Sequence, residues 1–162
     1  MDAAAAADPA ARSVAPPRPP FVDEHRIVVA APAERVWPVL AAEFGSTGGR
    51  GFEAYARFIG AKPLRSRGAP LDEGSTLPGF AVAEAVPGRS ARLVGRHFYA
   101  RYELALDLSE RPGGTLVRAR TYASFPGPLG RGYRLLVIGS GAHRALMIRR
   151  LAAVGRRAER SR

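Results

Sequence analysis

The sequence of 162 residues contains no cysteine, which excludes disulfides and thiolate metal sites. It also lacks a long apolar run. The longest, Leu135–Ala142, includes two glycines and soon meets His143 and Arg144, whereas a bilayer span needs about 20 apolar residues. The N-terminus carries five alanines after Asp2 but no basic region and no long apolar core. We therefore expect no transmembrane segment, no signal peptide and a cytoplasmic location.

Lysine is almost missing, because Lys62 is the only lysine among 25 basic residues, and the net charge is +11. The preference for arginine and alanine indicates coding from a GC-rich genome rather than selection for nucleic acid. A basic surface still attracts phosphates and acidic lipids at low salt. The arginines from Arg149 to Arg162 lack interleaved aromatic residues that could stack on bases. A solvated helix face is therefore favoured over a specific nucleic-acid site.

Familiar catalytic fingerprints are also absent, since the sequence has no G-x-S-x-G motif, phosphate loop or dinucleotide-binding motif. The glycine-rich segment Gly45–Gly49 has no lysine and no strand–loop–helix setting. The three histidines show no short ligand spacing, which argues against a metal site. We expect no metal and no cofactor.

The length fits one domain with a short appendage. Residues 1–20 are rich in alanine and proline, cannot bury enough apolar surface to offset their ordering entropy, and are predicted to be a disordered tail. Residues 21–162 are predicted to form a single domain. A domain of this size buries roughly two-thirds of its extended-chain surface, enough for a core and a pocket.

The first part of the domain predicts one strand and two short helices. The strand is His25–Ala30, and the first helix, Ala33–Glu43, carries an apolar stripe at helical spacing. Pro38 should kink this helix or shift its effective start. Aromatic spacing predicts a second helix over Phe52–Ile59 after a Gly/Ser/Thr linker. Residues 60–76 are irregular, with a weak edge strand near Pro63–Arg67.

The second part predicts antiparallel strands followed by one apolar-faced helix. Short Gly-containing loops join strands that alternate apolar and polar residues. The strands are Phe80–Val86, Ala91–His97, Arg101–Leu108 and Thr115–Phe125. Leu129–Ala158 can form a helix of about 45 Å, which must overhang the domain or bend at Gly139–Gly141. The apolar face of the sheet needs this helix as a cover. The predicted fold is α+β, with a hollow between a curved sheet and the helix.

This order of elements resembles the START-like (SRPBCC, helix-grip) superfamily. The residues that carry the resemblance are Ile27–Trp37, which look like its opening strand and AP-x-E-x-VW helix start, together with Leu77–Phe80 and Phe125–Gly127. The similarity covers about residues 21–160. It implies a curved sheet that grips the last helix around an apolar cavity. Members include polyketide cyclases and aromatases, lipid-transfer domains and bacterial binding proteins.

The candidate ligand-binding residues lie on the predicted inward faces and on the helix stripe. His143 is the only ionisable residue of that stripe, so it could hydrogen-bond a ligand carbonyl or act as acid or base. A core histidine satisfied by a neighbouring group is the alternative. His25 is expected to be solvated, and Tyr133 either closes the cavity mouth or packs under Pro126. The full candidate set is His143, His97, Tyr102, Thr121, Leu136 and Met147.

The leading functional hypothesis is a monomer or homodimer that binds a small hydrophobic or aromatic molecule between sheet and helix. The alternative is a polyketide cyclase- or aromatase-like enzyme, which needs His97, Tyr102 and His143 within hydrogen-bond reach of one another. A weaker alternative is a partner-binding module that uses the basic helix and the tail.

Overall fold

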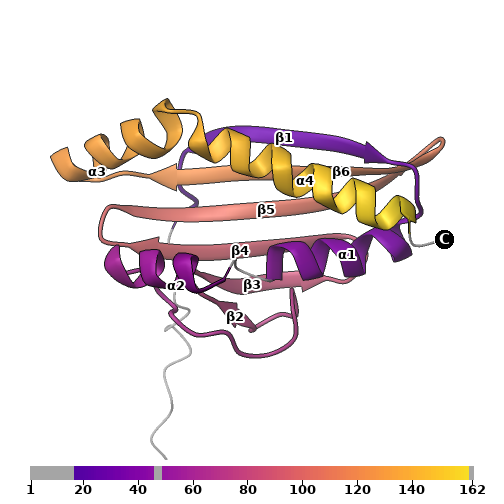
Figure 1. The fold of residues 1–162 in the computed structure, drawn as a ribbon, viewed down its shortest axis with the longest axis horizontal. Coiled ribbons are helices and arrows are strands. Elements are labelled where there is room, and N and C mark those ends of the chain that lie inside the picture. Colours follow the sequence, from indigo (N-terminus) through magenta and orange to yellow (C-terminus); the bar gives the residue numbers. More distant parts are fainter. Residues whose placement is uncertain (1–16, 46–48, 161–162) are drawn as a thin grey trace, which may run out of the picture.

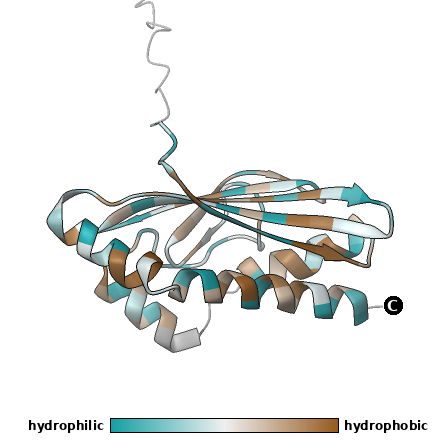
Figure 2. Cartoon of the chain, turned by 90° about the horizontal axis from the view of Figure 1, so that it is seen from above, coloured by the Kyte–Doolittle hydropathy of each residue, from teal (hydrophilic) through white to brown (hydrophobic). Residues whose placement is uncertain are grey.

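In the computed structural model, residues 17–45 and 49–160 are described. Most of the predicted tail, residues 1–16, and three residues of the predicted linker, 46–48, lie outside the described residues. The described chain forms one antiparallel sheet with a layer of helices on one of its faces (Figures 1 and 2).

The sheet has six strands in the order β1-β6-β5-β4-β3-β2. The first strand, β1, pairs with the last, β6. From β6 to β2 the neighbouring strands follow one another in reverse order of sequence. The four predicted strands of the second part are confirmed, and β1 and β5 are longer than expected. The bounds are β1 Phe21–Val29, β2 Thr76–Leu77, β3 Phe80–Val86, β4 Ser90–His97, β5 Ala100–Arg111 and β6 Gly114–Ser124.

The two short helices after β1 are also confirmed, as α1 Ala33–Gly45 and α2 Gly49–Phe58. Pro38 lies inside α1, which begins at Ala33 and continues past it. The predicted edge strand near Pro63–Arg67 is wrong. Only isolated bridges form there, at Lys62 and Arg67, partly because Pro63 has no N–H to donate to a ladder. The short edge strand is β2.

The C-terminal helix bends where its glycines are. It consists of α3 Gly127–Arg134, the π-helical turn η1 Leu135–Gly139 and α4 Ala142–Arg160. Between η1 and α4, Gly141 adopts a φ of 77°, a left-handed conformation that glycine reaches without a Cβ clash. Of the two outcomes predicted for this long segment, the bend is therefore confirmed.

The core lies between the sheet and the helices α1 and α4. Val117 of β6, Leu106 of β5 and Val154 of α4 are fully buried there. Polar contacts hold α4 in its middle and at its end: the Arg150 guanidinium donates to the Glu43 carbonyl oxygen at 2.7 Å, and the Ala30 N–H donates to Glu159 at 3.0 Å. The part of α4 nearer to η1 lines a cavity, through His143 and Met147.

The outer face of the sheet is less solvated than the alternation in β5 predicts. Glu103 and Ala105 face outward, yet both are buried. Glu103 is 3% exposed because Arg18 and Arg92 cover it, with N–O distances of 2.8 and 3.4 Å. The architecture is the predicted α+β helix-grip fold. None of the described helices has the length and apolar character needed to span a bilayer.

Candidate functional site

A cavity of about 180 Å³ lies between the inner face of the sheet and the C-terminal helices. Strands β3 to β6 form its floor, α2 forms one side wall, and α3, η1 and the start of α4 form the other. The wall is mostly apolar and aromatic. Its lining side chains include Phe52, Tyr55, Ile59, Phe80, His97, Tyr102, Leu104, Thr121, Ala123, Phe125, Tyr133, Val137, Ile138, His143 and Met147.

At the end of the cavity near the β4–β5 hairpin, aromatic rings pack together. The rings of His97 and Tyr133 are 4.7 Å apart and edge-on, and those of His97 and Tyr102 are 5.4 Å apart. The Tyr133 hydroxyl lies 2.7 Å from the Tyr55 hydroxyl, so α3 and α2 are joined across the cavity. Burial and this hydrogen bond raise the pKa of Tyr133, which therefore keeps its proton. Tyr133 closes one side of the hollow.

His97 presents a hydrogen-bond donor at this end. Its Nδ1 is 3.1 Å from the Tyr99 backbone N–H and accepts from it. The proton of the neutral ring therefore sits on Nε2. Burial lowers the pKa of His97, which favours that neutral form. Within residues 17–45 and 49–160, Nε2 has no hydrogen-bond partner, so its N–H is available to a ligand acceptor.

Tyr102 contributes its ring to the wall, but its hydroxyl is already engaged. The hydroxyl donates to the Gly79 carbonyl oxygen at 2.7 Å, and burial raises the pKa of Tyr102. Gly95 permits this arrangement, because a Cβ at that position would lie 2.0 Å from the Gly79 oxygen and 2.5 Å from the Tyr102 ring. The Tyr102 hydroxyl therefore holds the sheet edge in place rather than facing a ligand.

His143 lies on the side of the cavity opposite to His97, where the first turn of α4 contacts β6 and β1. Its Nε2 is 3.1 Å from the Thr121 hydroxyl and 3.4 Å from Oδ1 of Asp23. The other oxygen of Asp23 is 3.1 Å from Nε2 of His25, and the two histidine rings are 6.4 Å apart. The expectation that His25 is solvated is wrong: its side chain is only 12% exposed. Edge strand β1 is covered by α4, which encloses the inward-facing Asp23 and His25.

The sequence-predicted residues are thus only partly brought together. His97, Tyr102, Thr121, His143 and Met147 line one cavity. In the described chain, however, His143 hydrogen-bonds to Thr121 rather than to His97 or Tyr102. Leu136 does not line the cavity: it is 69% exposed, and the next two residues, Val137 and Ile138, line it instead. No group of three or more metal-ligating side chains in the described parts of the chain is arranged to hold a metal ion.

Sequence reasoning missed the contribution of α2 and of strand β1. The spacing of Phe52 and Tyr55 predicts a short helix, and in the structure both side chains line the cavity. Asp23 and His25 are two residues apart in β1, so strand parity places them on one face. Only the position of α4 shows that this face is enclosed.

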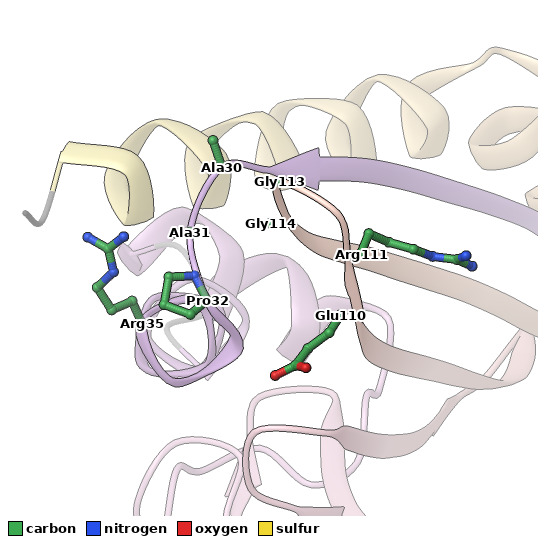
Figure 3. Close-up of a pocket in the computed structure, with 8 residues that line it drawn as sticks. All are labelled: Ala30, Ala31, Pro32, Arg35, Glu110, Arg111, Gly113 and Gly114. Atoms are coloured by element: carbon green, nitrogen blue, oxygen red, sulfur yellow. The ribbon is translucent and has the colours of Figure 1, made fainter.

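A second hollow, of about 330 Å³, lies at the far end of the molecule, where the β1–α1 connection meets the β5–β6 hairpin (Figure 3). Backbone and small residues form much of its surface, including Pro32 and Gly114. The charged side chains of Arg35, Glu110 and Arg111 point in different directions and do not converge on a common point (Figure 3). It offers less for recognition than the aromatic cavity.

Comparisons with known proteins support the fold. Neither the protein-family models nor the curated proteins include a match to this sequence. An uncharacterised protein from Rhizobium leguminosarum has a similar structure, with a TM-score of 0.55 and 15% identity over 86% of this chain and 94% of that one. A conserved protein from Geobacillus kaustophilus gives a TM-score of 0.51 and 16% identity over 85% and 95% of the two chains.

A weaker likeness is to StfQ, a di-domain ARO/CYC protein from the steffimycin biosynthetic pathway. The TM-score is 0.48 and the identity 13%, over 85% of this chain and 50% of that one. At this level of similarity nothing about the chemistry of this chain follows from it. The likenesses above 0.5 show the fold alone.

Proposed function

We propose that this protein binds a small apolar, aromatic molecule in the cavity between its sheet and its C-terminal helices. The observation that carries the proposal is a hollow of about 180 Å³ with aromatic walls and polar groups at two separate places. Apolar walls provide affinity, and a few polar groups fix orientation. This hollow holds more than a single water molecule, whose share of liquid volume is about 30 Å³.

The two polar places fit different parts of one ligand. At one end, the Nε2–H of His97 can donate to a carbonyl or hydroxyl oxygen. Across the cavity, the Thr121 hydroxyl and the His143 ring form a hydrogen-bonded pair at the wall, 3.1 Å apart. A planar ring between them would stack against the aromatic side chains and present one oxygen to His97. Stacking of this kind is worth about 0.5–1.5 kcal/mol beyond the area buried.

The enzymatic alternative, a polyketide cyclase- or aromatase-like reaction, has less support. It requires His97, Tyr102 and His143 to act as one polar cluster on a ligand. The Tyr102 hydroxyl is engaged by Gly79, and His143 by Thr121. Binding needs none of these contacts to break, so we propose binding as the function.

We further propose that the chain belongs to the START-like (SRPBCC) superfamily. The support is the helix-grip arrangement together with the opening residues Ile27–Trp37, which span the end of β1 and the start of α1. Pro32 directly precedes Ala33, the first residue of α1, where its missing N–H removes no helical hydrogen bond.

The binding proposal is tested with 2-naphthol, a bicyclic aromatic probe with one hydroxyl, followed by its fluorescence. The Ala123→Leu variant puts three more carbons into the cavity and should weaken binding at least about tenfold. The matched control is Ala83→Leu, the same change on β3 beside a groove on the other face of the sheet, which should bind as the wild type does. Equal binding by the wild type and Ala123→Leu, or none by either, would contradict the proposal.

A further inference from the structure

Three leucines of the C-terminal segment are largely exposed to solvent in the described structure. Leu129 of α3 and Leu135 and Leu136 of η1 are 75%, 70% and 69% exposed, and we call them the outer leucine patch. Leu129 and Leu136 are seven residues apart, which places them on about the same helical face. In Figure 1, α3 projects beyond the end of β6.

The outer leucine patch lies directly outside the cavity. Tyr133, which lies between Leu129 and Leu135, and Val137 and Ile138, immediately after Leu136, line the cavity wall. The same short segment therefore has one side on the cavity and one side in solvent. Whatever covers the patch lies next to the cavity wall.

Along the chain, the charged residues before and after the patch all have the same sign. Between Glu110 and Glu159 the sequence contains no aspartate or glutamate, but it contains ten arginines. Arg131 and Arg134 of α3 and Arg144 and Arg149 of α4 are exposed. Nothing acidic within this segment of the chain neutralises them.

We propose that the outer leucine patch docks this protein onto an anionic lipid bilayer. Leucine side chains on a helix that lies in the interface are buried at the boundary between headgroups and acyl chains. The flanking arginines meet the negative surface potential of the lipid phosphates, which contributes about fivefold in affinity per charge close to the surface. An anionic bilayer therefore satisfies both the apolar and the cationic groups.

Two other occupants satisfy only one of these features. A second copy of this chain, docked through the same patch, would cover the leucines but bring the arginines of both copies together. A single-stranded RNA would neutralise the arginines but leave the leucines in water. Docking on a bilayer goes beyond the proposed binding function and does not depend on it, because the patch does not line the cavity.

The experiment is co-sedimentation of the full-length protein with unilamellar vesicles of phosphatidylcholine alone or mixed with phosphatidylglycerol. We expect binding to the mixed vesicles that weakens with salt. The double variant Leu135→Ser/Leu136→Ser should reduce the partition coefficient by about tenfold or more. Because both side chains are exposed, the variant should unfold at the same urea concentration as the wild type.

Matched charge variants separate the patch from the overall charge. Arg131→Gln/Arg134→Gln should weaken binding by about tenfold or more. Arg89→Gln/Arg111→Gln removes the same charge from the two turns at the opposite end of the sheet, and should change binding by less than about threefold. Equal losses in the two charge variants would contradict docking through this patch.

Three further results would overturn the proposal. One is the absence of binding to the mixed vesicles. Another is binding that the leucine variant leaves unchanged and single-stranded RNA displaces, which would indicate a polyanion surface. The third is a wild-type dimer in sedimentation velocity that becomes monomeric in the leucine variant. Binding of 2-naphthol by the wild type without vesicles is measured alongside: its absence would contradict the cavity proposal and not this one.

Discussion

The hydroxyl of Thr121 on β6 lies 3.1 Å from Nε2 of His143 on α4, and this contact joins the floor of the cavity to its helical wall. Thr121 is 7% exposed, and the side chain of His143 is 18% exposed. Asp23 of β1 approaches the same nitrogen, so the sheet contacts this histidine from two strands. The start of α4 is therefore positioned by polar contacts with the sheet, whereas Leu151 and Val154 farther along the helix are buried in the apolar core.

Removal of this contact should cost measurable stability. We expect Thr121→Val to lower the free energy of unfolding by about 1 kcal/mol, because the hydrogen bond is lost within a buried region. The measurement is urea denaturation. The control is Thr76→Val, whose hydroxyl donates to the Arg65 carbonyl oxygen at an exposed edge, and which should cost less than about 0.5 kcal/mol. A cost for Thr76→Val as large as for Thr121→Val would contradict this ranking.

Two alanines on the same face of β6 should respond differently to enlargement. Ala119 is fully buried in the packed core, so Ala119→Leu should destabilise the protein by about 1–3 kcal/mol. Ala123 lines the cavity, so Ala123→Leu should cost less than about 1 kcal/mol. Thermal unfolding of the two variants compares them directly. Equal losses of stability in Ala119→Leu and Ala123→Leu would show that other side chains already fill the space beside Ala123.

A methyl group at Gly95 should disrupt the sheet edge. Its Cβ would lie 2.0 Å from the Gly79 oxygen, so Gly95→Ala should cost more than about 2 kcal/mol and displace the Tyr102 ring. The control is Gly132→Ala in α3, where a Cβ meets nothing within 4 Å and where alanine should stabilise the helix by about 0.5–1 kcal/mol. Urea midpoints of the two variants should therefore shift in opposite directions.

The stability of the protein should decrease in mild acid because of His97. Burial lowers its pKa below the ordinary value of 6.5, so the unfolded chain binds this proton more readily than the folded one. The contribution of neutral His97 to the free energy of unfolding is complete above pH 6.5. It is lost as the pH falls from 6.5 toward the lowered pKa of the folded state. The urea midpoint of His97→Gln should therefore fall less between about pH 7.5 and about pH 5.5 than that of the wild type. Parallel decreases would show that other groups cause the effect.

The strands could be predicted from the sequence because their signal is local. In β6, Val117, Ala119, Thr121 and Ala123 alternate with residues of the other face, and all four are buried. Short glycine-containing turns fixed the antiparallel pairing with β5. These features depend on the backbone and on neighbouring residues, so they are visible without a tertiary structure.

The placement of Leu136 shows where periodicity fails. The prediction extended a 3.6-residue spacing from Leu129 to Ala158, but η1 is a π-helical turn with a larger number of residues per turn. The extra residue rotates the stripe, so Leu136 faces solvent and Val137 and Ile138 face the cavity. Beyond Gly141 the apolar residues again lie at helical spacing, and Met147, Leu151 and Val154 are buried.

The sequence by itself determined the elements, their order and the inward faces of the long strands, because period and turn chemistry are properties of short segments. Only the tertiary structure decided that Asp23 and His25 are enclosed beside His143, that α2 supplies part of the cavity wall and that the outer leucine patch stays in solvent. These outcomes depend on where α2, α3 and α4 lie relative to the sheet. That position results from packing and hydrogen bonds between residues far apart in the chain, which no local pattern records.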